Sequence, residues 1–411
     1  MKFGGTSVAD AERIKRAARR IVAQREAGKR VVAVLSARGQ TTDELIAMAQ
    51  EVSASPDRRE LDMLLSTGER ISCALCAMAI NDLGHRAISL TGSQAGIVTD
   101  TSHTKARILD VRAERIREAL GEDRIVLVAG FQGVSTERDV TTLGRGGSDT
   151  TAVALAAAID AEVCEIYTDV SGVFSADPRI VPDARRLPLL SFEEMLEMAA
   201  SGARILQLRA VEYARNHGVR IHCRSSFNSE PGTFVLGEEE TMERPLITAV
   251  THAADEARIT LLGVPDRPGA AAAIFGALAD AGCNVDTIIQ NEPLGEGRGA
   301  EVSFTLPQED LPAAELALEP VARELGVGRV DTDRQIGKVS IVGAGMRSHP
   351  GVAANVFRTL ASKGINIEMI STSPIKISCV IRAEFVPEAV RALHGAFKLG
   401  AGGIEPDIGP R

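Results

Sequence analysis

The sequence lacks an excess of basic residues and long apolar runs, and each absence removes a class of function. Its 46 Lys and Arg are outnumbered by 55 Asp and Glu, which gives a net charge of -9. No dense basic face is available for phosphate backbones, so we predict no nucleic-acid partner. No apolar run approaches the ~18 residues that span a bilayer, and the N-terminus carries no signal-peptide core. We therefore expect no membrane partner and a cytoplasmic protein.

Cysteine is also sparse. Six Cys are scattered along 411 residues, and Cys73 and Cys76 form a lone C-x-x-C pair inside the apolar, helix-like segment ISCALCAMAI. No second ligand pair accompanies them, and a structural zinc site takes four ligands, so zinc or redox chemistry is disfavoured. We interpret the two thiols as core residues and assign no metal-ligating side chains.

The sequence does contain enough apolar residues for several cores. With 411 residues, of which 45% are hydrophobic, it is long enough for two or three domains of ~100–200 residues. Short β-branched segments alternate with longer helical patterns, with predicted strands at 31–36, 86–91, 124–131 and 162–168 and predicted helices at 41–52, 61–84, 104–120 and 149–160. This alternation predicts an α/β fold with a mainly parallel sheet sandwiched by helices. Ligands of such sheets bind outside the carboxyl ends of the strands.

An internal repeat organises the C-terminal part. ITLLGVPDRPGAAAAIFGALADAGCNVDTI returns as VSIVGAGMRSHPGVAANVFRTLASKGINIEMI, with the same spacing from Pro-Gly to Gly-x-Asn. Each copy predicts a strand, a helix and further strands, completed as a small βαββαβ domain. We place a catalytic domain at 1–236, a polar linker at 237–257, and the two copies at 258–332 and 333–411.

Three glycine-rich or turn-rich segments stand where chemistry is expected. KFGGTSV begins at Lys2, GRGGSDTT precedes a predicted helix, and YTDVSGVFSADPR leaves a predicted strand. Glycines let backbone N–H groups approach phosphate oxygens, and a helix N-terminus favours anions. The spacing is not that of a Walker loop. The structural alternatives are tight turns, and a helix cap made by Ser148 or Asp149, although a cap would not explain Arg145 between glycines.

Taken together, these segments resemble the aspartokinase branch of the amino-acid kinase family, and the repeat resembles a tandem of ACT domains. The resemblance covers nearly the whole chain, including TTDEL, STGER, TGSQAGI, VAGFQG and TTLGRGGSDTTAVALA. It implies that ATP, with Mg²⁺, phosphorylates the side-chain carboxylate of L-aspartate. The product would be 4-phospho-L-aspartate, the first intermediate toward lysine, threonine and methionine.

The resemblance also implies residue roles. Lys2, Asp149 and Arg145 would be catalytic, with Lys2 on the transferring phosphoryl group. Arg145 would bind the α-carboxylate of aspartate and Glu69 its α-ammonium. The remaining substrate-binding residues would be Thr42, Gly146, Gly147 and Ser148. The nucleotide would be held by Lys2, Gly4, Gly5, Ser7, Ser36, Thr168, Asp169, Phe174, Asp177, Arg179 and Arg204.

In the ACT pair, the resemblance implies a regulatory site. Threonine is the expected effector, and lysine is the second candidate because Pro374 replaces a family glutamate. The candidate effector residues are Asp266, Asn284, Asp286, Gln290, Asn366, Ile367 and Ser373. ACT modules pair through their sheets, so we expect a homo-oligomer. A hetero-oligomer with a small ACT-only subunit, started internally at Met242, is the alternative.

Several positions depart from the family pattern. The apolar strand expected before Lys2 is missing, which predicts that a central strand loses its ladder partner and places the start upstream or makes the chain truncated. Arg38, Ser171, Phe174 and Arg204 replace other residues. Two alternatives therefore stay open, namely another amino-acid or carbamate-type kinase and a non-catalytic amino-acid sensor.

Overall fold

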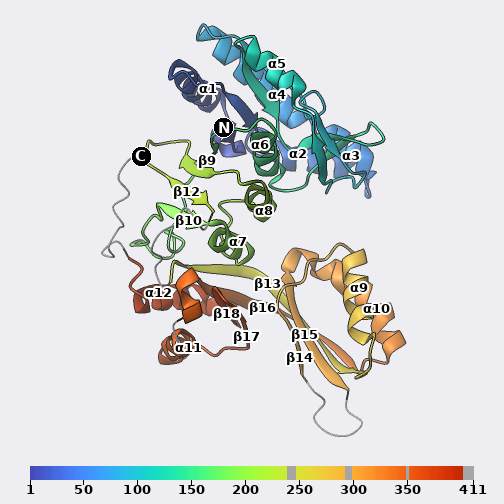
Figure 1. Cartoon of the computed structure of the whole chain (residues 1–411). Coiled ribbons are helices and arrows are strands. Elements are labelled where there is room, and N and C mark those ends of the chain that lie inside the picture. The colour runs from blue at the N-terminus through green and yellow to red at the C-terminus, as the bar shows by residue number, and fades with distance from the viewer. Residues whose placement is uncertain (238–246, 292–298, 349–350, 401–411) are drawn as a thin grey trace. The chain divides into compact units, whose positions relative to one another are not determined.

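The computed structural model describes residues 1–237, 247–291, 299–348 and 351–400, which divide into two units (Figure 1). The first unit comprises Met1–Phe174, Arg186–Ala200 and the described residues from Arg204 to 237. The second comprises Ser175–Arg185, Ser201–Ala203 and the described residues from 247 onward. Two short segments of the predicted catalytic domain therefore belong to the second unit.

An eight-stranded sheet forms the centre of the first unit, in the order β10-β12-β11-β9-β1-β2-β6-β3. Its strands are β1 (Lys2–Phe3), β2 (Val32–Leu35), β3 (Ala87–Leu90), β6 (Ile125–Ala129), β9 (Cys164–Thr168), β10 (Leu189–Ser191), β11 (Ile221–Ser225) and β12 (Thr233–Leu236). Every neighbouring pair is parallel except β11 with β12. The predicted mainly parallel α/β sheet is confirmed.

Helices cover both faces of this sheet. They are η1 (Gly5–Val8), α1 (Ala11–Glu26), α2 (Thr41–Val52), α3 (Arg58–Leu65), α4 (Thr67–Asp82), α5 (Glu114–Gly121), α6 (Gly147–Ala158), α7 (Phe192–Ala200) and α8 (Leu208–His217). Alternate strand residues point to opposite faces. Phe3 and Leu35 accordingly lie in one core with the apolar stripes of α1 and α4, and that core also contains Cys73 and Cys76. Lys2 points to the other face, toward α6.

A separate four-stranded sheet, in the order β5-β4-β7-β8, lies within the first unit. Its strands are β4 (Ile97–Thr99), β5 (Ile108–Val111), β7 (Gln132–Ser135) and β8 (Val140–Thr142). The predicted helix at 104–120 was wrong over its first half, since Ile108–Val111 pairs with β4 and only Glu114–Gly121 is helical. The apolar residues of this strand imitate one helical turn in the sequence. The predicted helix at 61–84 is divided into α3 and α4 at Ser66.

The central ladder is intact, contrary to the expectation drawn from the missing upstream strand. Lys2 pairs with Val34 of β2 and Ile166 of β9, so β1 lies between two parallel neighbours. Phe3 stacks on Tyr167 with ring centroids 4.8 Å apart. Two residues therefore suffice to hold Lys2 at the carboxyl end of a central strand.

One helical stretch passes a composition test for membrane spanning. Residues Arg58–Asp82, which include α3 and α4, form one run that is long and apolar enough, by length and composition alone, to cross a bilayer. The expectation that no stretch would approach this length was wrong in that respect. However, 44% of its most apolar window is buried inside the protein, and α4 packs against α1 and β3. This packing is typical of a core helix.

The second unit is built on a six-stranded antiparallel sheet in the order β14-β15-β13-β16-β18-β17. The strands are β13 (Ala249–Val264), β14 (Ile288–Asn291), β15 (Ala300–Pro307), β16 (Arg329–Val342), β17 (Met369–Ser373) and β18 (Lys376–Arg382). The helices are α9 (Ala270–Asp280), η3 (Gln308–Asp310), α10 (Leu311–Leu325), η4 (Ala344–Ser348), α11 (Val352–Ser362), η5 (Ala383–Phe385) and α12 (Val386–Ala396). Figure 1 shows α9 with α10, and α11 with α12, beside the two halves of the sheet.

The two repeat copies interlock. The early part of β13 pairs with the late part of β16, with Ala249 opposite Val342, whereas Leu261 pairs with both Val302 and Val330. The second copy thus takes its fourth strand from chain that precedes the first copy. Residues 249–257, predicted as part of a linker, are strand residues instead. The polar, aperiodic sequence there reflects a strand that serves two copies with different faces.

Candidate active site

Lys2 and Asp149 form an ion pair at the centre of the first unit. The Lys2 Nζ lies 2.6 Å from Asp149 Oδ1, and the two side chains are 12% and 11% exposed. Lys2 lies in β1 and Asp149 in the first turn of α6. The fold thus brings together two segments that are far apart in the sequence. Both side chains were predicted site residues, and the structure brings them into direct contact.

Helix α6 begins without a side-chain cap. Its N-cap is Gly146, which has φ 72°, a conformation that favours glycine, and within the described residues no side chain caps the first turn. A Cβ at Gly146 would lie 2.6 Å from the side chain of Gln207. Ser148 and Asp149 are therefore not helix caps. The N–H groups of Gly147, Asp149 and Thr150 instead donate to the Gly144 and Gly146 carbonyls, so what the helix end offers an anion is chiefly the positive end of its dipole. This geometry argues against the capping alternative.

The KFGGTSV turn lies beside this pair. A Cβ at Gly4 would be 3.6 Å from the Lys2 Nζ, and one at Gly5 would be 2.9 Å from the carbonyl oxygen of Ala37. The chain therefore passes very close to the strand end at Ser36, whose N–H donates to the Phe3 carbonyl over 3.1 Å. The buried Ser7 Oγ lies 2.6 Å from Ser226 Oγ, a partner that sequence reasoning missed. Such a glycine turn can admit phosphate oxygens close to the backbone.

Glu69 is a buried carboxyl group with one unused oxygen. It is 3% exposed, and its Oε1 accepts a hydrogen bond of 3.1 Å from the Ala37 N–H. Its Oε2 is buried and has no hydrogen-bond partner among the residues that the structure describes. Burial raises the pKa of Glu69 to about 7, against the lowering effect of backbone N–H groups and of Arg70. A cationic ligand at this oxygen would restore the charged form.

Arg145 is held by its backbone rather than by its side chain. Its side chain is 86% exposed, with Nη2 3.6 Å from Asp43 Oδ1. Asp43 follows Thr42 in the first turn of α2, so the predicted substrate residues Thr42 and Arg145 are close neighbours. Gly147 donates its N–H to the Gly144 carbonyl over 3.0 Å, which folds the loop tightly around Arg145.

The predicted nucleotide residues fall into both units. Thr168 ends β9 in the first unit, and its Oγ1 donates to Asp169 Oδ1 over 3.0 Å. Phe174 is the last residue of that segment. Asp177 and Arg179 belong to the second unit, where Arg179 Nη2 lies 2.7 Å from Asp177 Oδ2. Arg204 begins the next segment of the first unit.

The predicted effector residues lie at the ends of helices and strands in the second unit. Asp266, Asn284 and Gln290 are exposed around α9 and β14, and Asn366 is exposed after α11. Ile367 is half-buried against the apolar core that α11 and α12 form with β18, and the Ser373 Oγ accepts from the Ile375 N–H over 3.4 Å. The Asp286 carboxylate bonds Lys338 of β16, a contact that the sequence did not suggest.

A cavity of about 720 Å³ lies at the amino ends of strands in the large sheet, opposite to the carboxyl ends where Lys2 and Asp149 meet. Its lining includes Val32, Cys164 and Ala156, where β2 and β9 begin, and none of the predicted site residues. Ligands of parallel sheets bind at carboxyl ends, so we do not assign this cavity to the chemistry. In the described part of the chain, no cluster of three or more His, Cys, Asp or Glu could hold a metal.

Comparison with known proteins gives the same picture. The amino acid kinase family matches residues 1–225, and the ACT domain matches residues 258–323 and 339–397. The aspartokinase of Mycolicibacterium smegmatis is 56% identical over 402 residues, which cover 97% of this chain and 96% of that protein.

Two solved structures of E. coli aspartokinase III are also similar. The complex with aspartate and ADP (R-state) has a TM-score of 0.82 at 25% identity, covering 96% of this chain and 98% of that one. The complex with lysine and aspartate (T-state) has a TM-score of 0.74 at 26% identity, covering 96% and 98%.

The fold and site therefore define an amino acid kinase that carries two ACT domains. Its length, domain order and relatives are those of one branch of that family. The chain belongs to the aspartokinases, and the enzyme activity of the family is aspartate kinase.

Proposed function

We propose that this chain transfers the γ-phosphate of ATP to the side-chain carboxylate of L-aspartate, giving 4-phospho-L-aspartate for lysine, threonine and methionine synthesis. The observation that carries this proposal is the Lys2–Asp149 pair, with 2.6 Å between Nζ and Oδ1, beside an uncapped helix N-terminus. A fixed cation beside the positive end of a helix dipole is what a transferring phosphoryl group needs.

The reaction needs positioning more than proton transfer. A carboxylate with pKa near ~4 is ionised at neutral pH, so its oxygen attacks the γ-phosphorus without a strong base. The new bond joins that oxygen to phosphorus as the bond to the β,γ-bridging oxygen breaks, and ADP leaves. Lys2 would neutralise the charge on the phosphoryl oxygens, with Asp149 holding the lysine in place. The Gly4–Gly5 turn would let phosphate oxygens come close to the backbone, and the positive end of the α6 dipole would attract them.

Aspartate would be recognised at both ends of its backbone. The Oε2 of Glu69, which is buried and has no hydrogen-bond partner among the described residues, suits the α-ammonium. Burial raises the pKa of Glu69 to about 7, and the ammonium cation would stabilise the ionised carboxylate. Arg145 suits the α-carboxylate, because its guanidinium is exposed and can form a bidentate contact. Thr42, Gly146, Gly147 and Ser148 complete the proposed pocket.

Mg²⁺ and ATP are proposed as the cosubstrate pair. Mg²⁺ is commonly held by one or two carboxylates plus substrate phosphates. Asp149 is a carboxylate at the proposed phosphate position, which fits that donor set, and the ion would neutralise phosphate charge during transfer. An adenine nucleotide is supported by the E. coli relative, which was solved with ADP.

We propose that threonine inhibits the enzyme through the ACT unit, with lysine as a weaker or joint effector. The repeat supplies Asp266, Asn284, Asp286 and Gln290 in one copy and Asn366, Ile367 and Ser373 in the other. Lysine is bound by E. coli aspartokinase III in its T-state. In this chain, Pro374 stands where the family has a glutamate, and proline offers neither a carboxylate nor an N–H. We therefore expect lysine without threonine to inhibit weakly.

The cytoplasm is the proposed location and a homo-oligomer formed through the ACT sheets the proposed assembly. The hetero-oligomer with an ACT-only subunit is the alternative, and its start codon residue Met242 lies outside the described residues. Expression of the gene with Met242→Leu, followed by gel electrophoresis and light scattering, separates the two. Loss of a small second band would establish the internal start, and an unchanged single species would dismiss it.

An ADP-release assay tests the proposed activity. Aspartate should support turnover and glutamate should not, and hydroxylamine should trap the acyl phosphate as a hydroxamate. Turnover with another amino acid or with carbamate, and none with aspartate, would replace the proposal with the carbamate-type alternative. Binding of ATP without any turnover would favour the sensor alternative.

A further inference from the structure

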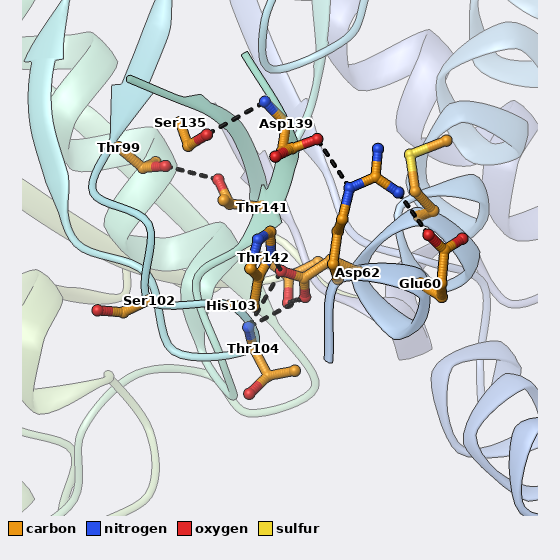
Figure 2. Close-up of polar contacts among 12 residues, drawn as sticks. Glu60, Asp62, Thr99, Ser102, His103, Thr104, Ser135, Asp139, Thr141 and Thr142 are labelled. Carbon is orange, nitrogen blue, oxygen red and sulfur yellow. Dashed lines mark hydrogen bonds and ion pairs between the residues drawn. The ribbon is translucent and has the colours of Figure 1, made fainter. Parts of the chain in front are cut away.

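A buried carboxylate outside the proposed site ties three segments of the first unit together. Asp62 of α3 is 0% exposed. Figure 2 shows it together with His103, Thr104 and Thr142. Its Oδ2 lies 2.8 Å from His103 Nδ1, and both of its oxygens accept from the Thr104 N–H over 3.1 Å. Its Oδ1 also accepts from Thr142 Oγ1 over 2.5 Å. Both carboxylate oxygens are thus engaged by partners from two other chain segments.

Thr142 and Thr104 lead directly to the Arg145 loop. Thr142 ends β8 and is followed by Leu143-Gly144-Arg145. A Cβ at Gly144 would lie 3.3 Å from the Thr104 carbonyl oxygen, so the loop rests on the Thr104 backbone. The Thr142 carbonyl in turn accepts from the Ala106 N–H over 2.9 Å. Asp62 therefore fixes both the strand that enters the loop and the surface beneath it.

Arg209 also holds this loop. Its guanidinium donates to the Leu143 carbonyl over 3.2 Å and to the Ala106 carbonyl over 2.8 Å. Burial lowers the pKa of Arg209. The Arg145 guanidinium itself lies near Asp43, and the acceptors of Arg209 are backbone carbonyls. The backbone of the loop is thus the part that these two residues hold.

The other end of the connection is the helix that carries Glu69. The Ser66 N–H donates to the Asp62 carbonyl over 3.0 Å at the junction of α3 and α4. Gln132 Nε2 donates to the Ser66 carbonyl over 2.8 Å, and Arg70 Nη2 donates to Ser66 Oγ over 3.0 Å. Glu69 lies three residues beyond Ser66 in α4. Asp62 thus stands where the helix of Glu69 meets the loop of Arg145.

Burying a carboxylate here is costly unless every oxygen is bonded, and an apolar residue would pack more cheaply. Asp62 occurs on the buried stripe of α3 with Leu65, a position where helix packing alone would favour leucine. Its three donors are directional, so they fix the separation between α3 and the β8 loop. Such fixed geometry matters for a ligand that is held at both ends.

We propose that Asp62, through Thr142 and Thr104, is a positioning residue that sets the distance between Arg145 and Glu69 and so tunes the enzyme for aspartate. The inference rests on the proposed roles of Arg145 and Glu69. Asp62 touches neither substrate nor nucleotide in this arrangement. Its removal should therefore weaken aspartate recognition while leaving ATP recognition in place.

The test compares KM values in the full-length protein. Asp62→Asn should raise the KM for aspartate by about 10-fold or more, because a small misplacement of positioning groups is expensive. The KM for ATP should stay within about two-fold of the wild-type value, a change too small to indicate a lost contact with ATP. Thr142→Val should act in the same direction, and Thr142→Ser, which keeps the hydroxyl, should restore the wild-type KM.

Thr141→Val is the matched control. Thr141 precedes Thr142 in β8, is also 0% exposed, and its Oγ1 lies 2.6 Å from Thr99 Oγ1. It loses a buried hydrogen bond of the same kind outside the Asp62 network. Its melting temperature should fall as in Thr142→Val, but its aspartate KM should not change.

Three outcomes decide the matter. A rise in aspartate KM confined to Asp62→Asn and Thr142→Val, with rescue by serine, supports the positioning role. Equal loss of stability in all variants with an unchanged aspartate KM overturns it and leaves a structural role only. If Arg145→Met and Glu69→Gln themselves leave the aspartate KM unchanged, the proposed substrate site fails, whatever Asp62 does.

Discussion

Both units place a lysine in a central strand of a sheet and pair it with carboxylate, but the two lysines differ in surroundings. Lys2 lies at the carboxyl end of β1, pairs with Asp149 over 2.6 Å and has the Gly4 backbone beside its ammonium. Lys338 lies within β16, is 2% exposed, and is bonded by Asp286 and, over 3.2 Å, by Glu256. Burial disfavours the Lys338 cation, yet the two carboxylates outweigh burial and raise its pKa.

The contrast separates a lysine that can serve a ligand from one that serves the fold. Lys2 has one carboxylate partner and a glycine turn through which phosphate oxygens can approach. Lys338 is neutralised twice over, and its position joins the two repeat copies. Arg258, the equivalent of Lys338 in the first copy, bonds Glu368 over 2.8 Å in the same reciprocal way. Each copy's acidic residue thus reaches the first strand of the other copy.

The largest effect should come from breaking the Lys2–Asp149 pair, which we propose to be catalytic. Lys2→Met and Asp149→Asn should each lower kcat by about 10²–10³-fold, because a preorganised charge aimed at the transition state is lost. The measurement is ADP release at saturating ATP and aspartate, with circular dichroism to establish folding. Lys29→Met is the matched control, since Lys29 bonds Glu162 over 2.7 Å on the surface. A kcat near that of the wild type in either site variant would remove this pair from the active site.

Substrate recognition should show the next largest effect. Glu69→Gln and Arg145→Met should each raise the aspartate KM by about 10–100-fold, since a hydrogen bond to a charged group contributes ~1.5–3 kcal/mol. The ATP KM should change little. Matched controls are Glu194→Gln, at a buried carboxylate that bonds Ser191, and Arg112→Met, at an exposed pair with Asp110. A rise in ATP KM with a constant aspartate KM would reverse the assignment of the two subsites.

How far the sequence predicts each unit follows from how each is connected. In the first unit, the proposed site lies at the ends of parallel strands, and the order of strands and helices in the sequence indicates where those ends are. The Lys2 turn and the α6 N-terminus were therefore suggested by glycines and charges, whereas the role of Glu69 was implied only by the family resemblance. Asp62 was not, because its role comes from donors 41 to 80 residues away. A carboxylate on the apolar stripe of α3, beside Leu65, was the available signal.

In the second unit, the repeat predicted two copies but not their exchange of strands. Periodicity shows that two segments are alike, not which strand completes which sheet. Residues 249–253 complete the second copy, although 76 residues or more separate them from β16. Segment 175–185 packs into the same core, with Ala176 and Val181 buried there. Long-range pairings of this kind leave no periodic trace in the sequence.

Effector binding in the second unit should give a moderate effect. Gln290→Ala and Asp266→Ala should raise the threonine concentration for half-inhibition by about 5–150-fold, the span of a typical allosteric coupling. The kcat without threonine should not change, because a ligand shifts an equilibrium only through its differential affinity. Titration against threonine, lysine and both together measures this. Indifference of the wild type to millimolar threonine would refute the effector, and strong inhibition by lysine alone would show that Pro374 does not weaken its binding.

The smallest effect concerns pH and isolates Glu69. Burial raises the pKa of Glu69 to about 7, so below that pH it holds a proton and loses its attraction for an ammonium group. The kcat/KM for aspartate should therefore fall toward a limit of about ten-fold per pH unit below pH 7, as expected for one proton. Burial also raises the pKa of the neighbouring Cys73 thiol well above this range, so that thiol does not titrate there.

Stability should change in the opposite direction, which makes the assignment testable twice. A carboxyl whose folded pKa exceeds its unfolded value binds more protons when folded, so its stabilising contribution is lost as pH rises toward 7. The amide side chain of the Glu69→Gln variant does not titrate in this pH range. It should show a kcat/KM for aspartate that is low but flat from pH 6 to pH 8, and a melting temperature that gains on the wild type as pH rises. A wild-type profile retained in Glu69→Gln would assign the titration to another group and remove Glu69 from ammonium binding.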